Sequence, residues 1–130
     1  CYFVNTMQQL ADYLDEVDHP AIKGMYDTFH ANIEEKDPVA AIKTIRKHMI
    51  HVHISENDRG TPGKGHVPWP ETYKALRAAK YDGWMTIEAF GRAIPALAAA
   101  TRVWRDFFPT RDSVYLEGLK QMKQGWARAK

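Results

Sequence analysis

The 130-residue sequence predicts an α/β fold in which three parallel strands alternate with helices. Three short apolar runs with strand character are separated by longer segments whose apolar residues recur at helical spacing. This alternation is typical of parallel strands joined by crossover helices. The pattern leaves two architectures open, an open doubly wound sheet and part of a (β/α)8 barrel. The length corresponds to one domain or to part of a larger one.

The first third of the chain contains signals for a helix, a strand and a second helix. The first helix is expected after Asn5 and Thr6, which are good N-cap residues, and before His19-Pro20. The first strand is expected at residues 21–27, with Asp27 at its C-terminal end. Asp37-Pro38 is an N-cap followed by a proline at the first helical position, so it predicts the start of the next helix.

The second strand is expected at residues 49–55, where two histidines lie one residue apart among aliphatic residues. Side chains alternate between the two faces of a strand, so His51, His53 and Ser55 share one face. We expect the opposite face of this strand, together with that of the third strand, to pack against helices. The apolar residues concerned are Ile50, Val52, Ile54, Met85 and Ile87.

The remaining signals predict a helix, the third strand and a largely helical C-terminal segment. Trp69-Pro70 begins a helix, which ends near the turn at residues 81–83. The third strand is expected at residues 84–89, with Glu88 near its C-terminal end. Beyond Pro95 we expect mostly helix, interrupted at Pro109. The last segment carries an apolar face formed by Tyr115, Leu119, Met122 and Trp126.

Composition excludes several classes of function. The net charge is +2 and the basic residues are scattered, so no nucleic-acid-binding surface is indicated. A single cysteine excludes an internal disulfide framework and favours a reducing, cytoplasmic compartment. No apolar run is long enough for a membrane span or a signal peptide. The glycine-rich stretch at 60–65 matches neither a dinucleotide-binding nor a phosphate-binding motif and is expected to be a flexible loop.

Polar residues occur near the C-terminal ends of all three predicted strands. Asp27, His53 and Glu88 occupy these positions, and in parallel α/β folds chemistry takes place there. Two carboxylates and an imidazole suit Mn²⁺, Co²⁺, Mg²⁺ or Zn²⁺ rather than a soft metal. His30 and Arg59 follow closely, in loops expected above the strands. They suit an oxygen-rich substrate, and they could equally be ordinary surface residues.

Three segments closely resemble the D-tagatose 3-epimerase and D-psicose (allulose) 3-epimerase family, which belongs to the xylose isomerase-like barrel superfamily. They are YDTFHANIEE (26–35), HVHISENDRGTPGKGHVPW (51–69) and YDGWMTIEAFGR (81–92). The resemblance extends from Cys1 to about Asp106. It implies that Asp27, His53 and Glu88 bind a divalent metal, usually Mn²⁺, and that His30 and Arg59 contact a ketose sugar. His51 is expected deeper on the same face, in a supporting layer.

One part of the family pattern is missing from the sequence. The family has a fourth metal ligand, a glutamate on the preceding strand that is also one of two acid/base groups. Its Glu-x-x-Asn-Arg-x-Glu pattern would fall just before CYFVNT (1–6). We therefore expect residues 1–130 to be the C-terminal half of a TIM barrel, carrying the last three strands with their helices. The start at Cys1 rather than methionine agrees with a cut chain.

The resemblance implies epimerisation at C3 of a ketose through an enediolate, with the metal as Lewis acid and Glu88 as one of two acid/base carboxylates. A hydroxypyruvate or xylose isomerase-like sugar isomerase is an alternative, since it would use a similar metal and base. A second alternative, an endonuclease IV-like zinc enzyme, would need an Asp-x-His pair where this chain has GKGHVPW (63–69). The aspartate of that pair is absent, which counts against this alternative. The third alternative is a half-barrel without catalysis. Since a half-barrel leaves strand edges and an inner face uncovered, we expect a homo-oligomer, most simply a symmetric dimer.

Overall fold

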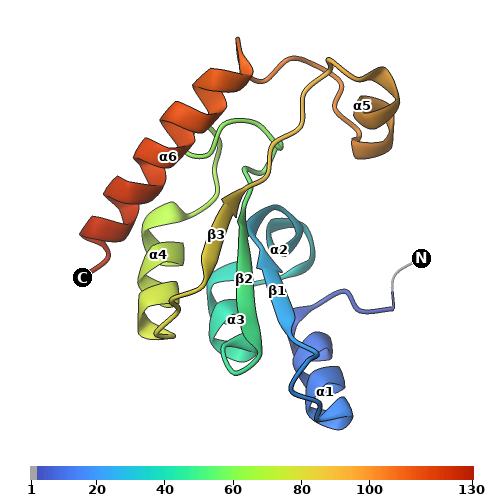
Figure 1. Cartoon of the computed structure of the whole chain (residues 1–130), viewed down its shortest axis with the longest axis vertical. Helices are drawn as coiled ribbons and strands as arrows, with labels where there is room; N and C mark the ends of the chain where they lie inside the picture. The colour runs from blue at the N-terminus through green and yellow to red at the C-terminus, as the bar shows by residue number, and fades with distance from the viewer. Residues whose placement is uncertain (1–2) are drawn as a thin grey trace.

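The computed structural model describes residues 3–130. Cys1, the basis for expecting a cut chain, lies outside them. The elements in chain order are α1 (Met7–Val17), β1 (Gly24–Asp27), α2 (Thr28–Glu34), α3 (Pro38–Ile45), β2 (Met49–Ile54), α4 (Trp69–Ala78), β3 (Trp84–Ile87), α5 (Pro95–Thr101) and α6 (Arg111–Arg128). The strands form one parallel sheet in the order β1-β2-β3 (Figure 1). The predicted α/β class with three parallel strands is confirmed.

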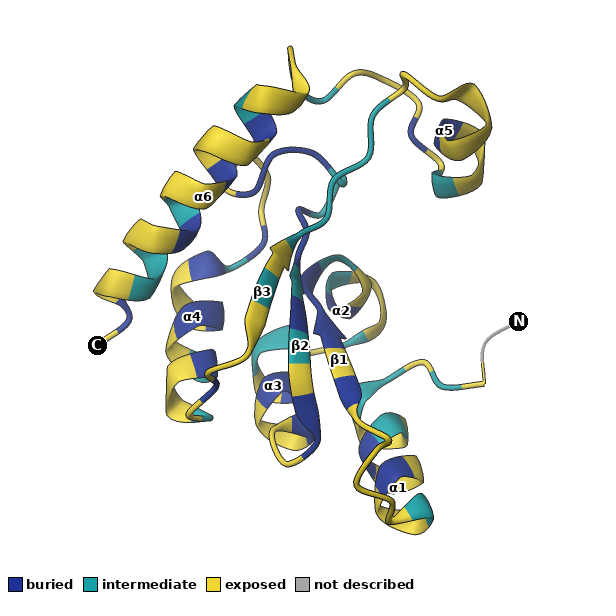
Figure 2. Cartoon of the chain, viewed as in Figure 1, coloured by how far each residue is buried: buried dark blue, intermediate teal, exposed yellow. Residues whose placement is uncertain are grey.

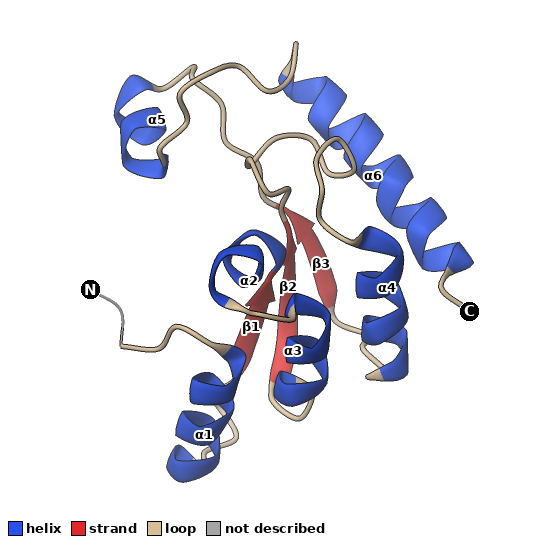
Figure 3. Ribbon diagram, turned by 180° about the vertical axis from the view of Figure 1, so that it is seen from behind, coloured by secondary structure: helices blue, strands red, loops and turns tan. Residues whose placement is uncertain are grey.

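Helices cover one face of this sheet and leave the other open. From the side shown in Figure 3, α2, α3 and α4 lie in front of the strands, whereas Figure 1 shows the strands in front. Figure 2 shows that buried residues gather on the strands and on the helix sides that face them. On the open face, Met25 is exposed and Trp84 is 80% exposed. A doubly wound sheet would carry helices on both faces, so this arrangement agrees with part of a barrel.

The register aligns the polar residues of the three strands on the open face. Asp27 pairs with His53, and His53 pairs with Thr86, while Tyr26, Val52 and Met85 form the neighbouring row toward the helices. Because the strands are parallel, their C-terminal ends meet at one edge of the sheet. This edge carries the candidate site.

One apolar residue of β2 does not face the helices. Gly24 pairs with Met49 and Met25 pairs with His51, which leaves Ile50 as an extra residue at an irregularity of the ladder. Ile50 is 59% exposed, so the prediction that it packs against helices is wrong. The prediction is confirmed for the other four positions. Val52 and Ile54 are fully buried, and Met85 and Ile87 pack against the core.

The strands are shorter than predicted at their ends. The Ile22 amide donates to the His19 carbonyl in a turn, and β1 therefore begins only at Gly24. β2 ends at Ile54 and β3 at Ile87. Beyond β3 the Glu88 amide still donates to Ile54, but the Phe90 amide turns to the carbonyl of Arg59. The chain leaves the sheet at this point.

The predicted helix starts agree with the structure, but two helical segments differ. Thr6 forms a capping box with Gln9, and the Asp37 carboxylate accepts from the first amides of α3. α2 was not predicted, because seven residues are too few to show a helical period. Beyond Pro95 the chain is mostly helical, as expected, but the break expected at Pro109 is longer and extends over residues 102–110.

The buried face of α6 differs in part from the predicted one, although Met122 is buried and Trp126 packs against the core as expected. Val114, Gly118 and Met122 are its buried residues, whereas Tyr115 and Leu119 are exposed. Gly118 lies so close to the Ile87 side chain that a Cβ there would approach it to 2.8 Å. A glycine contact carries no hydrophobic signal, which explains the error. None of the helices between residues 3 and 130 combines the length and apolar character that a membrane crossing requires.

Candidate metal centre

Asp27, His53 and Glu88 come together at the C-terminal edge of the sheet. Each offers one ligand atom, and these atoms lie within 4.8 Å of one another. His53 Nδ1 is 3.2 Å from Asp27 Oδ2 and 3.4 Å from Glu88 Oε1. Asp27 is the last residue of β1, His53 is the last but one of β2, and Glu88 directly follows β3. We call them the triad.

Asp27 has one oxygen engaged with the backbone and one directed at the triad. It is the last residue of β1 and the N-cap of α2, where its Oδ1 accepts from the amides of Phe29 at 2.8 Å and His30 at 3.2 Å. Its Oδ2 faces His53. The carboxylate is buried, so these amide bonds fix its orientation while Oδ2 remains available to a ligand.

The ends of β1 and β2 are joined by hydrogen bonds of Thr28. Its hydroxyl donates to the Ser55 carbonyl at 2.6 Å and accepts from the Ser55 amide at 2.8 Å. This connection fixes the spacing between Asp27, which directly precedes Thr28, and His53, which lies two residues before Ser55. His51 lies one row nearer the start of β2, with its ring centroid 5.1 Å from that of His53, and it is not part of the group of possible ligands.

Arg59 lies in the loop after β2 and reaches the triad through Glu88. Its Nη1 is 3.3 Å from Glu88 Oε2. The guanidinium lies over the ring of Phe29, 3.9 Å from the centroid, and 4.8 Å from the centroid of Phe90. The two oxygens of Glu88 therefore face different partners, His53 and Arg59.

His30 contacts this group through its backbone amide, which donates to Asp27, but not through its side chain. It lies in α2 rather than in a loop, so that expectation is wrong, and its side chain is exposed. Its ring meets the edge of the Phe29 ring at a centroid distance of 5.2 Å. Within residues 3–130 its side chain forms no hydrogen bond or ion pair with the triad or Arg59.

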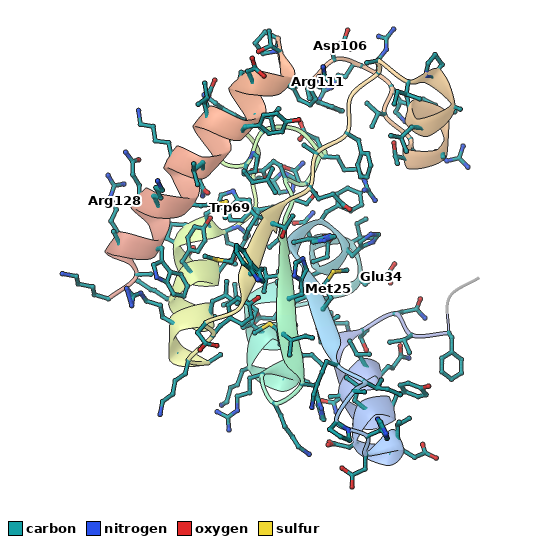
Figure 4. The ribbon with its side chains drawn as sticks, viewed as in Figure 1. Met25, Glu34, Trp69, Asp106, Arg111 and Arg128 are labelled. Atoms are coloured by element: carbon teal, nitrogen blue, oxygen red, sulfur yellow. The ribbon has the colours of Figure 1, made fainter. Side chains whose placement is uncertain are left out.

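A fully buried carboxylate, Glu56, was not identified from the sequence. Its Oε2 accepts from the Gly63 amide at 2.8 Å and from the Trp69 indole at 2.9 Å, and its Oε1 accepts from the Val67 amide at 3.0 Å. Figure 4 shows Trp69 at the start of α4. The glycine-rich loop expected to be flexible is thus anchored by one side chain. The signal was a glutamate directly before a loop with many backbone amides that need acceptors.

A cavity of about 720 Å³ lies beside the end of β3. Its lining comes from Ile87, residues 89–94, Leu97, residues 106–111, Val114 and Tyr115. Figure 4 shows Asp106 and Arg111 in that region, between α5 and α6. None of the triad residues, His30 or Arg59 lines it, but Phe90, which packs against Arg59, does, so the cavity adjoins the candidate site without including it.

The donor set of the triad fits a divalent cation. Two carboxylate oxygens and one imidazole nitrogen are hard to borderline ligands, the kind that suits Mn²⁺, Co²⁺, Mg²⁺ or Zn²⁺. Such ions have ligand distances of about 2.0–2.3 Å, and the observed separations are compatible with atoms grouped around one ion. A set of three protein ligands leaves coordination positions for a further ligand or a substrate.

The model of the xylose isomerase-like TIM barrel family matches residues 1–124. The chain belongs to this family. The three parallel strands are therefore part of a TIM barrel, as the sequence predicted. The chain is 40% identical over 123 residues to the "Probable ketose 3-epimerase" of Synechocystis sp., an alignment that spans 95% of this chain and 43% of that protein.

Two further comparisons confirm the resemblance to ketose 3-epimerases. The chain is 36% identical over 127 residues to the D-psicose 3-epimerase of Ruminiclostridium cellulolyticum, covering 98% of this chain and 43% of that protein. The crystal structure of D-psicose 3-epimerase with D-tagatose from Clostridium cellulolyticum H10 matches all of this chain with a TM-score of 0.87 and 32% identity, over 46% of that chain. The chain thus spans less than half of the length of the curated relatives it matches.

Proposed function

We propose that this chain is the C-terminal half of the barrel of a metal-dependent ketose 3-epimerase. The observation that carries the proposal is the convergence of the triad, in a chain similar to D-psicose 3-epimerase. Mn²⁺ is the proposed metal, with Co²⁺ and Mg²⁺ as alternatives, because the donors are two carboxylates and an imidazole. The proposed substrate is a small ketose sugar.

Epimerisation at C3 requires that a proton leave one face of the carbon and that a proton return to the other face. We assign one of these transfers to Glu88. Its carboxylate is held between His53 and Arg59, so its orientation is fixed before a substrate arrives. The triad offers no group for the opposite face, and we assign the second transfer to a carboxylate elsewhere in the barrel.

Arg59 and His30 are the proposed contacts for the oxygen atoms of the sugar. A guanidinium presents several N–H donors in one plane and suits neighbouring hydroxyl and carbonyl oxygens. His30 is exposed beside Phe29 and is therefore accessible to a ligand above the triad. A bound divalent cation would supply Lewis-acid polarisation of the ketose carbonyl, which acidifies the C3 proton.

A chimera tests this function in a complete barrel. The segment of the R. cellulolyticum D-psicose 3-epimerase that matches this chain is replaced by residues 1–130. With Mn²⁺, we expect the chimera to convert D-fructose to D-psicose. Glu88→Gln should lower kcat by roughly 10²–10⁴-fold, the usual contribution of a general acid or base. Glu117→Gln, an exposed residue of α6, is the matched control and should leave kcat unchanged.

Product analysis separates the proposal from its rivals. Formation of an aldose instead of the 3-epimer would identify a related sugar isomerase. A folded chimera without activity, or full activity in the Glu88→Gln variant, would contradict the proposed role of this half of the barrel.

A further inference from the structure

The guanidinium of Arg59 is enclosed by two phenylalanine rings that come from different strand ends. Phe29 follows Asp27 of β1 by two residues, and Phe90 follows Glu88 by two residues. The Arg59 Cζ lies 3.9 Å from the Phe29 ring centroid and 4.8 Å from that of Phe90. Cations are attracted to the faces of aromatic rings at such distances. Each ring thus lies two residues after one of the triad carboxylates in the sequence and also contacts Arg59.

The backbone on both sides of this contact is fixed by hydrogen bonds. The Phe29 amide donates to Asp27 Oδ1, and the Phe90 amide donates to the Arg59 carbonyl at 2.9 Å. The Arg59 amide donates to the Glu56 carbonyl at 2.9 Å, in a left-handed conformation with φ of 64° that non-glycine residues rarely adopt. A backbone held in this conformation at a candidate site is often part of its function.

The side chain of Arg59 is only partly satisfied by the protein. It is 13% exposed, and its Nη1 pairs with Glu88 at 3.3 Å. Its buried Nε has no hydrogen-bond partner among residues 3–130. A buried N–H without a partner costs free energy, and the hydrogen bond from Nη1 to Glu88 engages only one part of the guanidinium, so further contacts must help to keep it in place. The two rings are the groups in contact that do so.

We propose that Phe29 and Phe90 are positioning residues that clamp Arg59 and thereby hold the Glu88 carboxylate in the triad. Because Arg59 holds Oε2 of Glu88, Oε1 stays directed at His53. Loss of either ring frees the guanidinium, and Glu88 then loses its fixed orientation. This contact of Phe29 and Phe90 with Arg59, which we call the clamp, does not depend on which reaction the protein catalyses. Its role in positioning Glu88 toward a ketose substrate rests on the proposed function.

The reactivity of Arg59 toward phenylglyoxal, an arginine-selective reagent, tests the clamp directly. The full chain is treated with the reagent, and modification of the peptide carrying Arg59 is followed by mass spectrometry relative to the exposed Arg46. In Phe29→Leu and in Phe90→Leu, we expect the relative rate at Arg59 to rise roughly threefold or more, as loss of a cation–π contact predicts. Phe29→Tyr and Phe90→Tyr keep the ring faces and should keep the wild-type rate.

Trp126→Leu is the matched control, because Trp126 forms a cation–π contact with Arg77 far along the chain from the triad. It should leave the rate at Arg59 unchanged. Circular dichroism reports whether each variant is folded. If a leucine variant unfolds, methionine at the same position keeps the apolar volume without a ring and is measured instead. An unchanged Arg59 rate in folded variants that lack either ring would overturn the clamp.

Addition of Mn²⁺ and D-psicose separates the clamp from the proposed function. If Arg59 contacts the sugar, the ligands should slow modification of Arg59 in the wild-type chain. A ring-dependent rate without any effect of the sugar supports the clamp and counts against the sugar contact. A sugar effect without ring dependence supports the contact and counts against the clamp.

Discussion

Asp27 and Glu56 are both buried carboxylates, but their oxygens have different partners. Glu56 accepts from the amides of Asn57, Gly63 and Val67 and from the Trp69 indole. A carboxylate has about four acceptor positions, so Glu56 is saturated by its own loop. Asp27 engages the backbone with one oxygen only. Glu56 is therefore structural, and Asp27 retains an oxygen for a ligand.

Replacement of Glu56 tests its structural role. Glu56→Ala removes charge-assisted hydrogen bonds and leaves buried amides without acceptors, so we expect the free energy of unfolding to fall by about 2–4 kcal/mol. Urea denaturation followed by fluorescence measures it. Glu117→Ala, which removes a surface ion pair with Lys64, should change stability by less than about 1 kcal/mol. Equal losses in the two variants would contradict the account of the loop.

The triad was predictable from the sequence, whereas its supporting residues were not. Strand alternation and the shared edge of parallel strands place Asp27, His53 and Glu88 together without knowledge of the loops. Phe29 and Phe90 depend on where Arg59 goes, and Arg59 depends on a left-handed turn that Glu56 helps to fix. The path of such a loop leaves no regular pattern of apolar residues in the sequence, so these contacts could not be predicted from it.

Among the helices, too, some were predictable from the sequence and others were not. α1, α3 and α4 were predicted because they have caps, an initial proline or a regular apolar stripe. The missed α2 is short, and its N-cap residue, Asp27, is also the last residue of β1. The packing of α6 was misjudged because small residues define it. At Gly125 of α6, a Cβ would clash with the Tyr73 ring of α4.

Tyr73 joins α4 to α6 and makes stability dependent on alkaline pH. Its hydroxyl donates to Gln121 at 2.7 Å. Burial is the main cause that raises the pKa of Tyr73, and the negative charge of Glu56 raises it further. Since the folded-state pKa exceeds the unfolded value of about 10, the stabilisation is complete below that pH and is lost as pH rises toward the folded pKa.

Tyr73→Phe should therefore change the pH profile as well as the stability. We expect a loss of about 1 kcal/mol at neutral pH, from the missing hydrogen bond. Above about pH 10 the variant should lose stability less steeply than the wild type. Urea unfolding at several pH values measures both effects. Parallel profiles for the two proteins would show that ionisation of Tyr73 is not coupled to folding.

For the whole molecule, the open face of the sheet has the largest consequence. Met25 on β1 and Trp84 on β3 are exposed there, and these two outer strands have no strand beyond them within residues 3–130. The described helices leave this face of the three-stranded sheet uncovered (Figure 1). Exposed apolar surface and unpaired strand edges favour association.

We therefore expect the isolated chain to form a homo-oligomer, most simply a symmetric dimer. Light scattering at micromolar concentration should give a mass at least twice that of the chain. Trp84→Glu places a charge on the open face and should lower the fraction of oligomer. Ile33→Glu, at an exposed position of α2, is the control and should leave the mass unchanged. A folded wild-type monomer would contradict this expectation.

Titration with Mn²⁺ tests the central claim, that the triad holds a divalent cation. Binding is followed by electron paramagnetic resonance of free Mn²⁺ in the wild-type chain, in His53→Gln and in His66→Gln, whose histidine is exposed in the loop after β2. The account predicts one saturable site per chain in the wild type and in His66→Gln, and loss of that site in His53→Gln. Absence of a saturable site in the folded wild type, or equal binding by His53→Gln, would contradict it.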